Sequence, residues 1–173
     1  KTAKFSFLGN RAIPTVLRDI NEFMLENIAT GDTLYLYGLH LRAGTDQNDI
    51  DDRESETATL RANTYALPPG TPFMVLGDFN MQDSFEPGHD NLTDTGNGGY
   101  VIDPINRPGN WHSNSQFEDI HTQSTRTRAF GGGATGGLDD RFDMILISQN
   151  VADAGGVSYL SLIHISEPTR QAM

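Results

Sequence analysis

The chain has 173 residues, 36% of them hydrophobic and 20% charged, which suits one globular domain with a sizeable core. It has no cysteine, which excludes disulfides and thiolate metal sites. Any metal would therefore have oxygen or imidazole ligands, which favours a hard ion such as Mg²⁺. The formal net charge of -11 disfavours tight binding to a polyanion unless cations are present.

The first part of the sequence predicts a group of strands. Residues 5–8 alternate like a strand, and residues 11–17 and 20–25 are further strand candidates. Residues 20–27 also suit a helical turn. Residues 33–41 form the clearest strand, because aromatic and aliphatic side chains fill both faces. We expect this strand to lie in the interior of a sheet.

One helix is expected after the interior strand. Residues 53–67 carry apolar side chains at helical spacing, Asp51 or Asp52 can cap the helix, and the Pro-Pro-Gly run at 68–70 ends it. An acidic loop, residues 44–52, precedes the helix. Strand, helix and strand then follow one another, as in a layered α/β fold.

Residues 71–80 read TPFMVLGDFN, an apolar strand that ends in a carboxylate and a carboxamide. Asp78 and Asn80 point to the same face of this strand, about 7 Å apart. The carboxylate can hold a metal ion or a water molecule, and the amide can donate to an anionic oxygen. Together with His40, near the end of the preceding strand, they predict a site at the strand ends.

The remaining sequence has weaker patterns. Residues 81–130 are rich in Asn, Asp, Gly and Pro and predict surface loops, which at this length are usually functional or mobile. The glycine-rich segment 131–137 suits a flexible hairpin connection. It could also approach a phosphate, although it lacks the Lys and the helix start of a P-loop. Residues 142–148 predict a further strand.

Four motifs follow one another along the chain: Leu39-His40-Leu41, Arg53 with Glu56 on a helix, Gly77-Asp78-Phe79-Asn80, and Arg141-Phe142-Asp143 opening a strand. This ordered set resembles the endonuclease/exonuclease/phosphatase superfamily, which has the DNase I-like fold. The resemblance implies an α/β (α+β) fold, a partial four-layer sandwich of two face-to-face β-sheets flanked by helices. We assign residues 1–159 to this partial domain.

The resemblance also implies roles for four residues. His40 resembles the histidine that contacts the scissile phosphate and can serve as an acid, and Asp78 the carboxylate that orients or deprotonates the attacking water. Asn80 resembles the amide that contacts the phosphate or the metal, and Asp143 the carboxylate that orients a second histidine. Asp78 and Asn80 are therefore the expected ligands of Mg²⁺, or of Mn²⁺ or Ca²⁺. The structural alternatives are a core position for His40, a purely structural role for Asp78 and Asn80, and an ion pair of Asp143 with Arg141 or another arginine.

Several residues suit either a substrate-binding or a structural role. Trp111 could stack on a base or meet a lipid, and Arg126 and Arg128 could hold a phosphate. Packing and solvation account for these three residues equally well. His112 and His121 are interpreted as surface residues.

Two acidic residues and one pair of helical residues also suit a structural role. Asp139 and Asp140 could supplement a metal site, but a solvated turn is the preferred interpretation. Arg53 and Glu56 are expected to form an ion pair or to hold the acidic loop.

Two parts of the family's site are not found in this sequence. The family places a metal-binding Glu in an early Gln-Glu motif, which the sequence lacks, and Glu22 and Glu26 lie in a different context. The family also has a Ser-Asp-His element after the strand of Asp143. Here the stretch from Leu160 to Arg170 instead resembles a translated sequencing adaptor, codon for codon, although an ordinary strand with a Pro-terminated tail is the alternative. We therefore expect truncation at both ends and exclude residues 160–173, including their histidine, from the domain.

The resemblance implies a fragment of a divalent-metal-dependent phosphoesterase, with a nuclease that hydrolyses phosphodiester bonds as the preferred interpretation. Because two parts of the family's site are missing, we expect the fragment itself to be inactive. The alternatives are a lipid or sugar-phosphate phosphatase and a non-catalytic binding or scaffold domain of the same fold. We expect nucleic acid or another phosphate ester as partner, and a monomer without a membrane span. The acidic, Asn- and Gly-rich loops favour a secreted bacterial protein.

Overall fold

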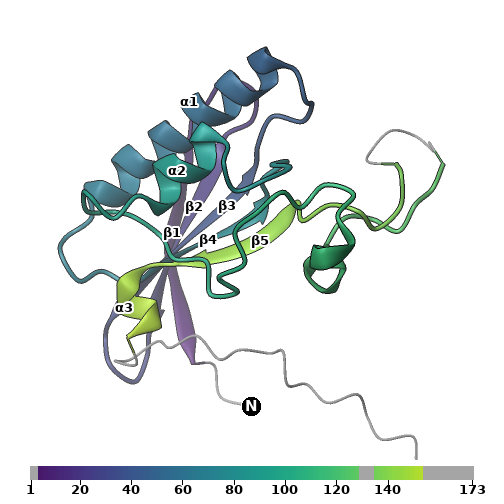
Figure 1. Ribbon diagram of the computed structural model, residues 1–173. Helices are drawn as coiled ribbons and strands as arrows, with labels where there is room; N and C mark the ends of the chain where they lie inside the picture. Colours follow the sequence, from purple (N-terminus) through teal and green to yellow (C-terminus); the bar gives the residue numbers. More distant parts are fainter. Residues whose placement is uncertain (1–3, 129–134, 154–173) are drawn as a thin grey trace, which may run out of the picture.

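The computed structural model describes residues 4–128 and 135–153, which contain nine helices and strands (Figure 1). In chain order these are β1 (Phe5–Ile13), β2 (Ile20–Asn27), β3 (Thr33–His40), α1 (Gln47–Tyr65), β4 (Phe73–Asp78), α2 (Pro87–Thr93), the 3₁₀-helix η1 (Ser115–Ile120), β5 (Asp143–Ile147) and α3 (Gln149–Ala152). The adaptor-like stretch and the expected domain boundary at residue 159 lie outside the described residues, and the glycine-rich segment is described only from residue 135.

The strands form a five-stranded sheet in the order β1-β2-β3-β4-β5. Neighbouring strands are antiparallel except β3 and β4, which run parallel and are connected through α1. A parallel pair needs such a crossover because the chain must return to the same end of the sheet. α1 and α2 lie together over one face of this sheet (Figure 1).

The predicted strands are confirmed, with two changes. β2 is a strand along its whole length, so the helical-turn alternative is wrong. β1 unites the predicted segment 5–8 with the residues that follow and ends at Ile13, whereas residues 14–17 lie outside the strand. Pro14 explains this end, because proline has no backbone N–H to contribute to a ladder of hydrogen bonds.

The predicted helix is confirmed but begins earlier than expected. Its N-cap is Asp46, not Asp51 or Asp52, and the backbone N–H of Asp46 donates to the Asp49 carboxylate at 3.3 Å. The acidic residues at 47–52 therefore belong to the first turns of α1, where negative charge suits the positive end of the helix dipole. Among the described residues, no helix is both long and apolar enough to cross a membrane.

The main core lies between the sheet and the helices α1 and α2. Leu60 of α1, Leu92 of α2 and Val75 of β4 are fully or almost fully buried in it. A smaller cluster lies on the other face, where Val151 of α3 packs with Leu34. The described residues thus form one sheet with its helical layer. This agrees with the expected α/β class and with a partial sandwich.

Residues 81–128, the described part of the segment 81–130, contain more regular structure than the sequence predicts. They contain α2 and η1, and Trp111 is completely buried in the main core. The Arg141 guanidinium lies 5.2 Å from the Trp111 ring centroid and makes two hydrogen bonds to Asp103 at 2.7 and 2.9 Å. The prediction of surface loops is therefore wrong for α2, for η1 and for the buried Trp111, while the rest of the described segment consists of loops and turns.

Candidate active site

Three of the predicted catalytic residues lie in one row across the sheet. His40, the last residue of β3, pairs with Asp78, the last residue of β4, and Asp78 pairs with Asp143, the first residue of β5. Directly paired residues point to the same face, and this face is the one opposite α1 and α2. His40 Nε2 lies 3.5 Å from Asp78 Oδ2, and the two side chains are 50% and 31% exposed.

The row has an unusual charge balance because two carboxylates are neighbours. The pKa of Asp143 is raised, mainly by burial and further by the negative charge of Asp78, while His40 opposes the shift. Asp143 therefore holds a proton more readily than an ordinary aspartate. Such a shift beside a histidine and a second carboxylate is typical of sites that move protons.

Asn80 is held rigidly beside this row. Its φ of 52° is in the left-handed region, which asparagine tolerates better than most residues. Its backbone N–H donates to Asp78 Oδ1 at 3.0 Å, and its side-chain Nδ2 donates to the Leu41 carbonyl oxygen at 3.0 Å. One N–H of the amide is thus committed to the chain that follows β3, and the side-chain oxygen remains the group suited to a cation.

Gly77 lets the two parallel strands approach each other next to the row. Its φ is 138°, and a Cβ at this position would collide with the Leu39 carbonyl oxygen. Only glycine fits such a backbone without strain. The glycine of the Gly77-Asp78-Phe79-Asn80 motif therefore has a steric reason.

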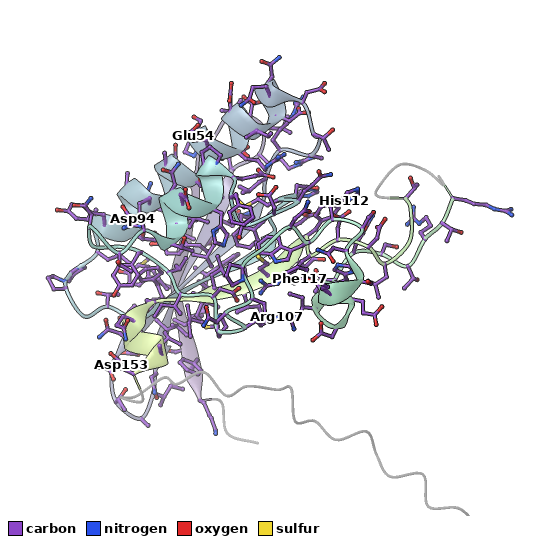
Figure 2. All side chains as sticks on the ribbon, in the orientation of Figure 1. Glu54, Asp94, Arg107, His112, Phe117 and Asp153 are labelled. Atoms are coloured by element: carbon purple, nitrogen blue, oxygen red, sulfur yellow. The ribbon has the colours of Figure 1, made fainter. Side chains whose placement is uncertain are left out.

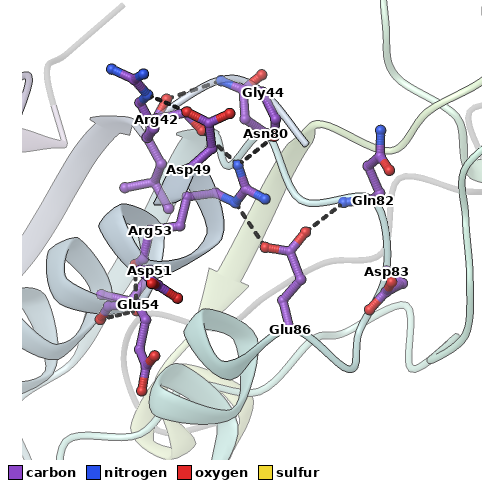
Figure 3. A network of polar contacts seen from close by, with 12 residues as sticks. Arg42, Gly44, Asp49, Asp51, Arg53, Glu54, Asn80, Gln82, Asp83 and Glu86 are labelled. Atoms are coloured by element: carbon purple, nitrogen blue, oxygen red, sulfur yellow. Dashed lines mark hydrogen bonds and ion pairs between the residues drawn. The ribbon is translucent and has the colours of Figure 1, made fainter. Parts of the chain in front are cut away.

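A buried ion pair connects the two loops that leave the row (Figure 3). Arg53 of α1 and Glu86 are 1% and 7% exposed, and Arg53 Nε lies 2.7 Å from Glu86 Oε2. Arg53 Nη1 donates to the carbonyl oxygens of Arg42 and Gly44, both at 2.9 Å, and Glu86 Oε1 accepts from the Gln82 backbone N–H at 3.1 Å. The pair thus joins the loop after His40 to the loop after Asn80.

This network confirms one part of the sequence-based expectation and corrects another. Arg53 does hold the acidic loop, through its bond to Gly44. Its charged partner, however, is Glu86 rather than Glu56, which instead accepts from the Arg42 backbone N–H at 2.9 Å and from Thr15 Oγ1 at 3.2 Å. Arg53 and Glu86 are 33 residues apart, and no local pattern predicts such a pair.

Trp111 does not have the exposed surface that substrate binding would require. Its ring is fully buried, its Nε1 donates to the Arg107 carbonyl oxygen at 2.9 Å, and it contacts the His89 ring edge to face. The assignment of Trp111 to substrate binding is therefore corrected to a core position. Packing was one of the two interpretations that the sequence left open.

The two predicted phosphate-binding arginines lie apart from this core. Arg126 and Arg128 are exposed and belong to the segment after η1, which leads away from the sheet (Figure 1). Their role in substrate binding stays a prediction.

The two early glutamates lie on the wrong face of the sheet to serve the row. Glu22 pairs with Tyr37 on the face covered by α1, and Glu26 has the same orientation because side chains alternate along a strand. Arg11 donates to both Glu22 carboxylate oxygens, at 2.7 and 2.9 Å, and this lowers the pKa of Glu22 against the effect of its burial. Glu22 is therefore a structural ion-pair residue.

A polar pair that sequence reasoning missed lies at the same edge of the sheet. His112 Nδ1 is 3.0 and 3.1 Å from the two carboxylate oxygens of Asp140, which precedes Asp143 by three residues. The interpretation of Asp140 as a solvated turn residue is wrong, because its side chain is buried. The two residues are 28 positions apart, so only the three-dimensional structure brings them together.

The sheet with its crossover helix is similar in fold to solved structures of the DNase I-like, endonuclease/exonuclease/phosphatase type. An endonuclease/exonuclease/phosphatase family protein from Bacteroides thetaiotaomicron is similar, with a TM-score of 0.56 at 16% identity over 86% of this chain and 53% of that chain. A mannosyl-6-phosphatase of the same organism gives a TM-score of 0.53 at 17% identity over 84% and 54%. D. rerio TDP2, complexed with single strand DNA product, gives 0.50 at 18% identity over 83% and 53%.

These identities are low, so the likeness establishes the fold alone. The chain spans about half the length of these structures. No protein-family model and no curated protein sequence matches it.

Proposed function

We propose that the chain is part of a divalent-metal-dependent phosphoesterase. A nuclease that hydrolyses phosphodiester bonds is the preferred candidate. The observation that carries this proposal is the row of His40, Asp78 and Asp143, with Asn80 beside it, on a DNase I-like sheet. The similarity to TDP2 complexed with a DNA product supports nucleic acid as the substrate.

The row contains groups that phosphodiester hydrolysis requires. The reaction needs a positioned water, stabilisation of the developing negative charge and a proton for the leaving oxygen. Asp78, in the middle of the row, can orient or deprotonate the water, and the half-exposed His40 can donate to a phosphate oxygen.

The metal ligands are only partly present among the described residues. The Asp78 carboxylate and the Asn80 side-chain oxygen are hard donors that suit Mg²⁺ or Mn²⁺, and Ca²⁺ less strictly. No group of three or more His, Cys, Asp or Glu side chains in residues 4–128 and 135–153 could hold a metal ion. When bound, a divalent ion would supply positive charge at the phosphate. We therefore propose that the chain alone is inactive.

A phosphatase for sugar or lipid phosphates is the second candidate. It is favoured by the similarity to a structure described as a mannosyl-6-phosphatase. A non-catalytic domain of the same fold is a third candidate, which the incomplete set of metal ligands would fit.

The test compares the chain with the longest reading frame that contains it, each with Mg²⁺ and with a chelator. The substrates are plasmid DNA, RNA, bis-p-nitrophenyl phosphate and mannose 6-phosphate. We expect no turnover by the chain alone and phosphodiester cleavage by the longer frame. Asp78→Ala should lower that rate by about 100-fold or more. Asp83→Ala is the matched control, because this carboxylate caps the Phe85 backbone N–H at 2.7 Å, outside the row.

The outcomes separate the candidates. Cleavage of mannose 6-phosphate alone would replace the nuclease by a phosphatase. The longer frame could also carry the missing Glu and Ser-Asp-His element, bind Mg²⁺ and still cleave none of the substrates. That result would overturn the nuclease and the phosphatase in favour of a non-catalytic domain.

A further inference from the structure

The pair of His112 and Asp140 combines an accessible ring with a buried carboxylate. The His112 side chain is 45% exposed, whereas that of Asp140 is 4% exposed. Both Asp140 oxygens lie within 3.1 Å of Nδ1, so the carboxylate holds the ring from its buried side. Nε2 is the ring nitrogen left for a ligand. Its neighbour in the structure is Ser113 Oγ at 3.4 Å, a distance too long for a strong hydrogen bond.

Backbone contacts connect this pair to the loop that follows Asn80. The N–H groups of Trp111 and His112 both donate to the Gln82 carbonyl oxygen, at 3.0 and 3.1 Å, and Gln82 follows Asn80 by two residues. Asp140 precedes Asp143, which belongs to the row, by three residues, so both members of the pair lie on chain segments that adjoin residues of the site. Figure 2 shows His112 near the N-terminal end of β5, where Asp143 begins the strand.

The arrangement is costly for a purely structural contact. Burial raises the pKa of Asp140, and the hydrogen bond from His112 only opposes this shift. A buried carboxylate needs a charged or donating partner, and an arginine would meet that need without exposing a titratable ring. Ser113, directly after His112, has a φ of 49°, so the backbone at this position is also strained. The strained backbone and the ring held by Asp140 together indicate that the orientation of the His112 ring serves a function.

We propose that His112, oriented by Asp140, is a substrate-binding residue of the candidate active site and donates from Nε2 to a non-bridging oxygen of the bound phosphate ester. A histidine whose Nδ1–H is held by a carboxylate has a fixed tautomer, and its protonated form presents a single N–H to an anionic oxygen. The inference rests on the proposed phosphoesterase function. Because Asp139 adds a negative charge near Ser113, with Oδ2 3.4 Å from Ser113 Oγ, phosphate binding should require Mg²⁺.

The test observes the imidazole resonances of the 173-residue chain by NMR. Dimethyl phosphate, an unreactive phosphodiester, and inorganic phosphate are titrated in the presence of Mg²⁺. We expect the resonances of His40 and His112 to move together with a common Kd. His121 is the internal control and should not move. Its Nε2 and Nδ1 lie 2.8 and 3.3 Å from the carbonyl oxygens of Trp111 and Leu138, so both ring nitrogens are occupied.

Three variants separate substrate binding from structural support. His112→Asn removes the donor, and we expect about a tenfold rise in the Kd of dimethyl phosphate. Asp140→Asn keeps the shape but not the charge, so it should change the tautomer signals of His112 and also raise this Kd. It carries the test if His112→Asn does not fold. His121→Asn, the matched control, should lower the melting temperature and leave the Kd unchanged.

The results distinguish this inference from the function on which it rests. If His40 responds while His112 is silent, or if His112→Asn and Asp140→Asn lower the melting temperature without changing the Kd, the pair is structural and the inference fails, while the proposed function stands. If neither histidine responds to phosphate, the inference fails, whereas the proposed function is decided separately by cleavage in the longer reading frame.

Discussion

At the scale of single residues, Gly77 is the position at which the row depends most directly on backbone shape. We expect Gly77→Ala to lower the free energy of unfolding by roughly 3 kcal/mol or more, because a collision with the Leu39 carbonyl oxygen adds to the strain of its positive φ. Gly31→Ala is the control: φ is also positive, at 76°, but a Cβ meets nothing within 4 Å, so the cost should be about 1–2 kcal/mol. Equal losses in urea unfolding would contradict the steric explanation.

The carboxylate of Asp143 should make stability depend on pH in a defined direction. Its pKa is raised in the folded state, so the fold favours the protonated form. This contribution to stability is complete below the ordinary value of 3.8 and is lost as the pH rises through the raised pKa. Asp143→Asn should therefore raise the melting temperature at neutral pH, and the gain should disappear on acidification.

Asp103 provides a control of opposite sign for that pH series. Burial alone would raise the pKa of Asp103, but the hydrogen bonds and charge of Arg141 outweigh it, and the pKa is lowered. Its stabilising contribution is present above 3.8 and is lost as the pH falls through the lowered pKa. Asp103→Asn should thus lower the melting temperature at neutral pH, with a smaller loss in acid. Parallel pH profiles for the two variants would refute this account.

The same residues show what a sequence can predict at this scale. The sequence predicted that Asp78 and Asn80 lie together, but β4 ends at Asp78 and Asn80 has a left-handed backbone, so a turn and not strand alternation joins them. The register that aligns His40 and Asp143 with Asp78 depends on strand pairing, which no local pattern shows; the family resemblance implied the roles of these residues but not their register. The position of Trp111 could not be predicted, because the sequence around an aromatic residue in a polar, glycine-rich segment does not show whether its side chain is exposed or buried in the core.

At the scale of secondary-structure elements, α1 contributes more than a covering layer. Through Arg53 it holds the loops that leave β3 and β4 in fixed positions relative to each other. We expect Arg53→Ala to cost about 3–5 kcal/mol, because it leaves the buried Glu86 carboxylate without its charged partner. The loss is measurable by denaturant unfolding of the whole chain.

An exposed ion pair supplies the matched control. Arg107 and Asp119 form a pair of similar length, 2.9 Å, but with side chains 38% and 63% exposed. Arg107→Ala should cost about 1 kcal/mol or less, since solvent screens this pair. Comparable losses for Arg53→Ala and Arg107→Ala would show that burial of the Arg53 pair is unimportant.

Element positions followed from the sequence where periodicity was strong. The apolar β3 and β4 and the helical spacing of α1 required no tertiary information. The start of α1 was missed because acidic residues before the apolar positions suit both a loop and a first helical turn. α2 and η1 were missed because helices of seven and six residues are too short to show a period and depend on contacts such as Leu92 in the core.

At the scale of the whole molecule, the sheet face opposite α1 is largely apolar. Phe7, Phe23 and Ile145 lie on it and are 62%, 38% and 50% exposed. Apolar side chains gathered on one accessible face favour association, which runs against the monomer expected from the sequence. The high net negative charge opposes close approach of two chains, so added salt should promote association.

We therefore expect the average mass of the chain, measured by sedimentation, to rise with protein concentration, and to rise further in salt. Phe23→Asp and Ile145→Asp should each reduce this increase, because a charge on the face must be desolvated on contact. Phe85→Asp is the control: this side chain is 72% exposed, but it lies in the loop before α2 and should leave association unchanged. A constant monomer mass at every concentration would show that charge repulsion outweighs the apolar face, whereas equal effects of all three substitutions would show that association depends on net charge alone.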